Sequence, residues 1–178
     1  MIGAYSIGFT FSPAVLLVVM GIMLVEMFVS RKNEGTLRGR GAVEPPGDVY
    51  RTMRWAYPCA FILMAIEGAL SGAPPVQIFY AGVLLMAVSK ALKWWAMASL
   101  GVRWTFRVLV VPGAPLVTHG PYAIWRHPNY IAVVGELLAM AVMTGARITG
   151  PVATLLFSWL MWQRIRVEER ALRYPTCT

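Results

Sequence analysis

Long apolar blocks separated by polar connections constrain this chain more than any other feature of its sequence. Residues 11–30 are apolar apart from Glu26 and small hydroxyl residues. A helix of that length, rising about 1.5 Å per residue, crosses a hydrocarbon core of about 30 Å. Similar blocks follow at 55–70, 76–98, 130–144 and 148–162. Because only helices and closed barrels span a bilayer, they predict an all-α, polytopic membrane protein with about five transmembrane helices, the last two forming a short hairpin.

Basic residues are distributed unequally among the connections between these blocks. Six lie at 31–54, five at 90–126 and four at 164–173, and these three segments share one side of a five-helix arrangement. Arg147 lies on the other side. Since Lys and Arg are enriched in cytoplasmic loops, we expect the N-terminus outside and the C-terminus in the cytoplasm.

The same pattern gives no reason to divide the chain. We expect one integral membrane domain over residues 1–178, with three N-terminal spans in 1–98 and a loop, a helical hairpin and a C-terminal helix in 99–178. Lys90 and Lys93, beside two tryptophans, are typical of a helix end at the membrane interface.

Charge and motifs exclude several function classes. The formal charge of +8 indicates contact with membrane lipids in a protein of this kind. We expect no nucleic acid partner, because no basic stretch is interleaved with stacking aromatics. The chain contains no HExxH, no cluster of Cys or His and no glycine-rich phosphate loop. We therefore expect no metal and no Rossmann-type cofactor site.

Three carboxylates lie within apolar blocks, where each costs about 2.5 kcal/mol or more at a lipid-facing helix centre. Glu26 is near the cytoplasmic end of its block, where it can pair with Arg31 or Lys32. Glu67 is near the external end, where partial hydration makes a charge tolerable. Glu136 lies two turns into the fourth block, and there we favour a functional role over a structural one.

The segment at 108–130 contains turn-forming and polar residues in apolar surroundings. Irregular backbone near a membrane persists where it is buried in protein or lines a wet cavity, so this segment predicts a pocket. Its last residues place Arg126, His127, Asn129 and Tyr130 at the start of a helix, with Pro128 at a position that proline favours. The free backbone amides of a helix start attract an anionic group.

The segment RIRVEERAL at 164–172 is the second polar constellation. Arg164 and Glu168 are four residues apart and share a helix face. One interpretation is a solvated helix end with surface ion pairs. The other is ligand binding, since this helix end emerges on the same side as the RHPNY segment, and opposite charges beside an apolar cavity suit a zwitterion.

Together, RVLVVPGAPLVTHGPYAIWRHPNY, an apolar hairpin and RIRVEERAL resemble the isoprenylcysteine carboxyl methyltransferase family. The resemblance covers residues 103–172 and implies a helical pocket at the cytoplasmic face that binds S-adenosylmethionine. It also implies a lipophilic acceptor that enters from the bilayer.

Carried onto this sequence, the resemblance implies a set of cofactor contacts: Ala114, Pro115, Leu116, Val117, Tyr122, His127, Pro128, Asn129, Tyr130 and Glu168. Arg164 is the implied catalytic residue, facing the acceptor, and Arg107 is a further candidate for the cofactor. Ala132 stands where the family usually has Gly, which narrows the expected pocket.

The chain is most similar to the compact bacterial branch of this family, which implies the inner membrane and puts the literal prenylated acceptor in doubt. We rank a phenolic lipid or alkylpyrone hydroxyl first and an isoprenylcysteine-like carboxylate second. The alternatives are a phospholipid N-methyltransferase, an NADPH-dependent membrane reductase of the sterol reductase type, and a non-catalytic membrane subunit.

Overall fold

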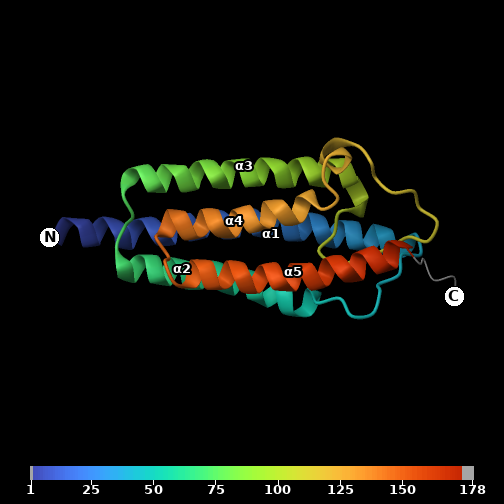
Figure 1. Ribbon diagram of the computed structural model, residues 1–178, viewed down its shortest axis with the longest axis horizontal. Helices are drawn as coiled ribbons and strands as arrows, with labels where there is room; N and C mark the ends of the chain where they lie inside the picture. The colour runs from blue at the N-terminus through green and yellow to red at the C-terminus, as the bar shows by residue number, and fades with distance from the viewer. Residues whose placement is uncertain (1, 174–178) are drawn as a thin grey trace.

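The computed structural model describes residues 2–173 of the chain. Over this range the chain folds into five α-helices and two short 3-10 helices. The elements, in order, are α1 (Ile2–Gly39), α2 (Tyr50–Ser71), α3 (Val76–Leu100), η1 (Gly101–Arg103), η2 (Gly120–Ala123), α4 (Pro128–Thr144) and α5 (Thr149–Arg173). The long helices run side by side along one axis, and the irregular segments 40–49 and 101–127 gather at one end (Figure 1). The prediction of an all-α fold is confirmed over these residues, where the one β contact is an isolated bridge between Val43 and Val110.

Two predicted helix boundaries are wrong. We expected a polar loop from residue 31, but α1 continues to Gly39, because the segment offers helix-forming residues and a Ser30 to Glu34 hydrogen bond of 2.9 Å along the helix. The helix ends where Gly41 adopts a φ of +78°, a conformation that glycine favours. The expected C-terminal helix is also not separate, since α5 runs without interruption to Arg173.

The side chains are distributed as in a membrane protein. Large apolar residues point outward from α1, α2, α3 and α5, among them Leu17, Leu70, Leu84 and Leu155, each at least two thirds exposed. Two segments, Pro13–Gly39 and Val76–Arg103, are long and apolar enough to cross a membrane, while α4 is apolar but shorter. Such a surface is unfavourable in water and suits contact with lipid.

The centre of the bundle contains charges. Lys90 Nζ lies 2.8 Å from Glu26 and 3.0 Å from Glu136, and Lys93 Nζ lies 2.6 Å and 3.3 Å from the same two carboxylates. We call these four residues the charge quartet. All four side chains are at most 7% exposed. Tyr57 adds a hydrogen bond of 2.6 Å to Glu136.

The charge quartet corrects two interpretations. Glu26 pairs with lysines of α3, not with Arg31 or Lys32 of its own helix. Lys90 and Lys93 are buried in the bundle instead of anchoring α3 at the membrane interface. Their spacing of three residues places both on one face of α3, and that face meets α1 and α4. Charges within apolar helices are tolerated when they face the bundle interior and pair there.

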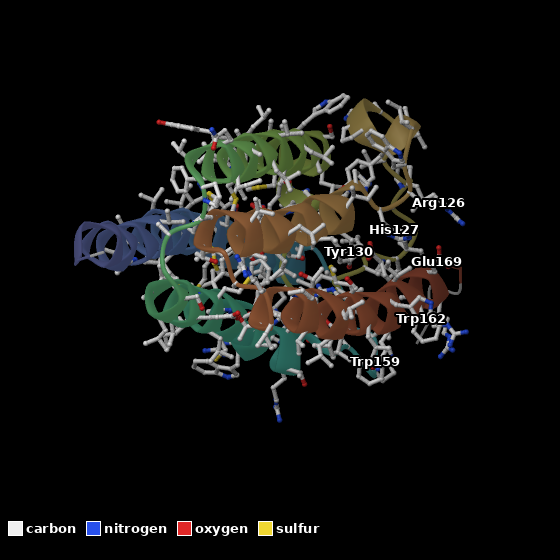
Figure 2. The ribbon with its side chains drawn as sticks, turned by 60° about the vertical axis from the view of Figure 1, so that its left-hand side comes forward. Arg126, His127, Tyr130, Trp159, Trp162 and Glu169 are labelled. Atoms are coloured by element: carbon white, nitrogen blue, oxygen red, sulfur yellow. The ribbon has the colours of Figure 1, made fainter. Side chains whose placement is uncertain are left out.

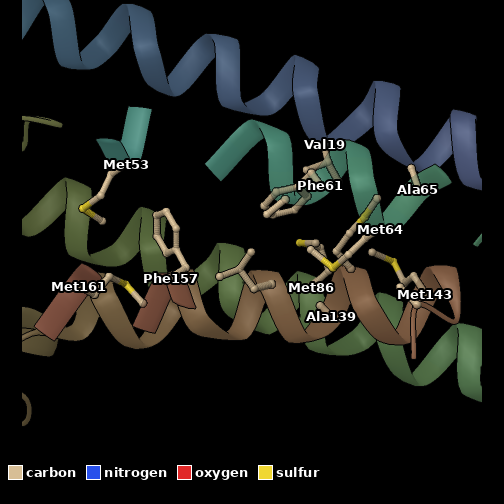
Figure 3. Packing of buried hydrophobic residues seen from close by; sticks show 14 residues of the cluster. Val19, Met53, Phe61, Met64, Ala65, Met86, Ala139, Met143, Phe157 and Met161 are labelled. Atoms are coloured by element: carbon tan, nitrogen blue, oxygen red, sulfur yellow. The ribbon is translucent and has the colours of Figure 1, made fainter. Parts of the chain in front are cut away.

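Around the quartet, the apolar core is rich in methionine (Figure 3). Met64 and Met140 are fully buried, and Phe61 packs beside them. Methionine fills irregular gaps because its side chain is unbranched and flexible. Helices α3 and α4 approach closely at Gly82, where an added Cβ would lie 2.6 Å from the Met143 side chain. Small residues allow such contact between helices.

Glu67 caps the start of α5. Its carboxylate accepts hydrogen bonds from the backbone N–H groups of Ile148 at 2.9 Å and Thr149 at 2.7 Å. A carboxylate is favourable at a helix N-terminus, where backbone N–H groups lack helical partners. Glu67 thereby fixes α2 against the α4–α5 turn, in a half-buried position.

Candidate functional site

A cavity of about 100 Å³ lies at the end of the bundle where α4 begins and α5 ends. Its walls come from three parts of the chain: the segment after α3, the start of α4 and the last turns of α5. The lining residues are Leu100, Arg103, Trp104, Thr105, Arg107, Val108, Leu109, Val110, Tyr122, Arg126, His127, Asn129, Tyr130, Arg164, Glu168 and Leu172. The two polar constellations of the sequence therefore meet at one site, as predicted.

The start of α4 supplies one wall. His127 is the residue before the helix, with φ −133° and ψ 58°, and Pro128 is the first helical residue. Pro128 is buried and forms the base of the helix start instead of lining the cavity. Asn129 accepts a hydrogen bond of 3.1 Å from the indole N–H of Trp104. Trp104, only 2% exposed, thus anchors the loop to the helix.

Tyr130 links α4 to α5. Its hydroxyl donates to Glu168 Oε2 at 2.8 Å and accepts from Arg164 Nε at 3.0 Å. The three side chains form a chain of charge-assisted hydrogen bonds, which are shorter and stronger than neutral ones. One carboxylate oxygen of Glu168 is engaged in this chain, and Glu168 lines the cavity.

Arg164 is 7% exposed and makes further contacts. Its guanidinium donates to the backbone carbonyl of Phe106 and lies 3.9 Å from Asp48 Oδ1. Asp48 in turn accepts a hydrogen bond of 3.1 Å from the backbone N–H of Val108. Arg164 therefore positions the loop over the cavity as well as facing it.

His127 and Glu169 form the outer edge of the site. His127 Nε2 lies 3.3 Å from Glu169 Oε1, and Arg126 lies 3.6 Å from the same oxygen. Figure 2 shows His127 and Tyr130 directed toward α5, while Arg126 extends outward. The side chain of Arg126 is 77% exposed, so its ion pair contributes little to stability.

The loop is held from the side of α1 as well. Arg107 lies 2.7 Å from Glu44 and 3.4 Å from Glu34, and Asn33 donates to the backbone carbonyl of Trp104 at 2.8 Å. Burial of the Glu44 carboxyl acts to raise its pKa, but hydrogen bonds from Arg107 and Arg38 outweigh it and lower the pKa below 4.5. These contacts hold α1 to the segment that covers the cavity.

The sequence-predicted contacts divide into two groups. Tyr122, His127, Asn129, Tyr130, Arg164 and Glu168 line the cavity. Burial raises the pKa of Tyr122 above its ordinary value, and the nearby Glu168 carboxylate adds to this rise, so the phenol is neutral at physiological pH. Ala114, Pro115, Leu116 and Val117 lie on the loop outside the cavity wall, and three of the four are exposed.

Sequence reasoning missed several residues of the site, notably Trp104, Asp48 and Asn33. Asp48 and Asn33 come from the first polar connection, more than 50 residues before the cavity loop. A buried indole N–H in an irregular segment needs a hydrogen-bond acceptor. The side-chain amide of Asn129 is such an acceptor, so the sequence could have indicated that Trp104 belongs to the site.

The region that builds the cavity also carries the relationship to known proteins. The model of the isoprenylcysteine carboxyl methyltransferase (ICMT) family matches residues 82–174. The chain belongs to this family. Every residue that lines the cavity lies within the match. ICMT proteins are membrane methyltransferases, which agrees with the outward-facing apolar surface of the bundle.

Individual relatives match more of the chain than the family model does. The uncharacterized protein YpbQ of Bacillus subtilis is 32% identical over 149 residues, covering 83% of this chain and 88% of that protein. An uncharacterized protein of Haemophilus influenzae is 22% identical over 160 residues, covering 88% and 91%. Both bacterial relatives are matched over most of their length.

One plant relative is named for an enzymatic activity. It is a probable protein-S-isoprenylcysteine O-methyltransferase of rice (Oryza sativa subsp. indica), 28% identical over 102 residues. The match covers 54% of this chain and 51% of the rice protein. Since the chain spans about half of that relative, the likeness supports a methyltransferase and leaves the acceptor open.

Proposed function

We propose that this protein transfers a methyl group from S-adenosylmethionine to an oxygen atom of a lipophilic acceptor, with its site on the cytoplasmic face of a bacterial inner membrane. The observation that supports this most strongly is the Tyr130–Glu168–Arg164 chain at one cavity. It places a carboxylate and a guanidinium each within 3.0 Å of one hydroxyl group, beneath an irregular loop and beside an apolar outer surface.

The donor set suits this cofactor. Glu168 is an acceptor for an ammonium group, and the start of α4 with His127 suits a carboxylate. Leu109, Val110 and Leu172 offer apolar surface for a heterocyclic ring. The bound cofactor supplies an electrophilic methyl carbon on a cationic sulfur, so no covalent enzyme intermediate is needed and positioning provides most of the catalysis.

Arg164 is the residue that we propose to act on the acceptor. A carboxylate acceptor pairs with its guanidinium directly. A phenol or enol acceptor ionises more readily beside a fixed positive charge, and its proton is released to water before the oxygen attacks. In both cases Arg164 would orient the acceptor oxygen toward the methyl group that the cofactor would supply, with the demethylated cofactor as the leaving group.

The loop at 112–119 closes over the cofactor in this proposal. The cavity of about 100 Å³ is smaller than the roughly 300 Å³ at which small-molecule pockets begin, so we expect the cofactor to extend beyond the cavity toward this loop. Closure of this loop also brings Ala114, Pro115, Leu116 and Val117 to the bound molecule. We expect slower backbone hydrogen exchange at 112–119 when S-adenosylmethionine is added; unchanged exchange would contradict closure.

The placement of tryptophans supports the proposed orientation. The six exposed ones are Trp55, Trp94, Trp95, Trp125, Trp159 and Trp162. Those of α2 and α3 lie near the helix ends on the side of the cavity, and Trp159 and Trp162 point away from the bundle along α5 (Figure 2). Tryptophan marks membrane interfaces, and basic residues mark the cytoplasmic side. We therefore propose that all five helices lie in the bilayer with the N-terminus outside.

A phospholipid N-methyltransferase is the nearest alternative. The buried Arg164 guanidinium beside the cavity favours an anionic oxygen over the amine that N-methylation requires, because like charges repel at short range. The acceptor site therefore supports O-methylation.

Binding and transfer test the proposal in two stages. Detergent-solubilised protein is titrated calorimetrically with S-adenosylmethionine, its demethylated product and NADPH. We expect both methyl-cofactor forms to bind. Binding of NADPH alone would indicate a reductase, and binding of none of the three would indicate a non-catalytic subunit.

Transfer of a labelled methyl group is then measured with four acceptors: a phenolic lipid, an alkylpyrone, a farnesylated cysteine and phosphatidylethanolamine. We expect the phenolic lipid and the alkylpyrone to be methylated fastest and the farnesylated cysteine more slowly. We expect no methylation of phosphatidylethanolamine. Labelling of phosphatidylethanolamine alone would overturn O-methylation.

A further inference from the structure

A second, larger recess lies at the opposite end of the bundle. Its volume is about 880 Å³, within the roughly 300–1,000 Å³ of small-molecule pockets. It is lined by Ile78 of α3, Leu138 and Val142 of α4, Leu155 of α5 and the turn containing Pro74. We call this cavity the far recess. Most of its lining residues are apolar, which suits a hydrocarbon chain.

The short α4–α5 hairpin creates the far recess. Helix α4 has 17 residues and α3 has 25, so the α2–α3 turn extends beyond the α4–α5 turn (Figure 1). The two helices of the hairpin also pack closely. A Cβ added at Gly150 would lie 2.5 Å from the Cβ of Ala141, so only glycine fits there. A tight, short hairpin leaves space beside α3 that protein side chains do not fill.

An unpaired cation borders this recess. Arg147 lines it and is exposed, and its guanidinium forms no ion pair with any carboxylate of the described residues. The carboxylate of Glu67, on the neighbouring helix end, is occupied by the backbone N–H groups of Arg147, Ile148 and Thr149. A lone guanidinium beside an apolar cavity matches an anionic headgroup joined to a hydrocarbon chain, because guanidinium binds phosphate through paired hydrogen bonds.

We propose that the far recess is a binding site for one anionic phospholipid, with an acyl chain against Leu138 and Leu155 and the phosphate on Arg147. The lipid fills the space left by the short hairpin and supplies the counter-ion that Arg147 lacks. This site lies at the other end of α4 from the cofactor cavity and does not depend on the proposed methyl transfer.

Native mass spectrometry of the full-length protein tests the site. Delipidated protein is mixed with equal amounts of phosphatidylglycerol and phosphatidylcholine, and bound lipid is counted. We expect at least a fivefold preference for phosphatidylglycerol in the first bound lipid. Equal binding of the two lipids overturns the proposal. A spectrum that shows two protein chains together and no bound lipid also overturns it.

Three variants locate the site. Arg147→Gln is expected to abolish the preference for phosphatidylglycerol, and Leu155→Trp, which fills the recess from an exposed position, is expected to reduce binding of both lipids. Arg166→Gln is the matched control, since Arg166 is an exposed arginine in the last third of α5, and it is expected to keep the preference. If Arg147→Gln and Arg166→Gln behave alike, Arg147 is not the headgroup contact.

Competition with soluble glycerol phosphate distinguishes a site that binds the whole lipid from a site that binds phosphate alone. We expect it neither to bind at the lipid concentrations used nor to displace phosphatidylglycerol, because the acyl chain provides most of the contact. Displacement at equal concentration overturns the lipid assignment.

Discussion

The charge quartet and the cofactor cavity are both polar regions inside an apolar bundle, but they differ in how completely their charges are paired. In the quartet, each lysine contacts both carboxylates and each carboxylate contacts both lysines. At the cavity, Tyr130 engages one oxygen of Glu168, and Arg164 and Glu168 also face the open space. Charges that satisfy one another hold helices together, whereas charges with free hydrogen-bonding capacity beside a cavity are available to a ligand.

This difference also bears on Glu136. Its position in an apolar block, soon after the RHPNY segment, suggested function. In the structure Glu136 is fully buried, binds Lys90, Lys93 and Tyr57, and does not line the cavity. Its contacts are those of a residue that joins α4 to α2 and α3.

The largest expected effect comes from breaking the quartet. Lys93→Met leaves two buried carboxylates with one cation, and loss of one partner of a buried ion pair costs about 3–5 kcal/mol. We expect a loss of that size in the free energy of unfolding in detergent.

Removal of all four charges is the control for that variant. The combination Glu26→Leu, Lys90→Met, Lys93→Met and Glu136→Leu leaves no unpaired charge, and we expect it to recover most of the lost stability. A single variant as stable as the parent protein, or a quadruple variant less stable than the single one, would contradict the proposed pairing.

The second effect concerns cofactor affinity. Glu168→Ala removes the carboxylate beside the cavity, and we expect S-adenosylmethionine to bind at least 100-fold more weakly, about 2.7 kcal/mol. Glu169→Ala is the matched control one residue away, since Glu169 pairs with His127 and Arg126 at the edge, and we expect less than a tenfold change. Calorimetric titration measures both; equal losses would refute the assignment of Glu168.

The third effect concerns turnover. Arg164→Ala removes the proposed acceptor contact, and we expect kcat to fall about 100-fold, with S-adenosylmethionine affinity changed only severalfold. Arg164→Lys keeps the charge but loses the planar fork that contacts Tyr130 and the Phe106 carbonyl, so partial recovery is expected. If Arg164→Ala instead abolishes cofactor binding and leaves turnover at saturation intact, the two roles are reversed.

The smallest effect is a dependence of the free energy of unfolding on pH, caused by Glu44 in the segment at 40–49. The pKa of Glu44 is lowered below 4.5 in the folded protein, so its contribution is complete above about pH 4.5 and is lost as the pH falls through the lower folded value. Because the pairs with Arg38 and Arg107 are partly exposed, we expect Glu44→Gln to cost less than about 1 kcal/mol at pH 7.

Unfolding of the parent protein and Glu44→Gln at about pH 7 and pH 3 measures this contribution. The two proteins are expected to converge at the lower pH. A stability difference that grows as the pH falls would have the wrong sign for a lowered pKa.

Much of the fold could be predicted from sequence, because apolar length determines where helices form. The meeting of the RHPNY and RIRVEERAL segments could also be predicted, since both leave the bundle on one side. The extent of α1 could not, because the helix continues through a polar stretch until Gly39. Its pairing partners were also hidden: Glu26 has basic neighbours in sequence, and only packing shows that Lys90 and Lys93 reach it.

The loop contacts of the site were beyond prediction for a related reason. Asp48 and Asn33 act through backbone groups of the segment at 101–110, and backbone donors and acceptors are the same at every position of the sequence. Tyr130 and Glu168 are chemically distinctive side chains, and the resemblance named both as pocket residues, although their hydrogen bond to each other came only from the structure.

The charge quartet also has a consequence for how the chain is made. Glu26 emerges from the ribosome 64 residues before Lys90, and at about 5–20 residues per second the first carboxylate waits several seconds for its cation. During that interval α1 carries an uncompensated charge into the membrane, at a cost of about 2.5 kcal/mol or more. Pairing with Lys90 and Lys93 offsets this cost once α3 lies beside α1, so the third helix stabilises the first one in the membrane.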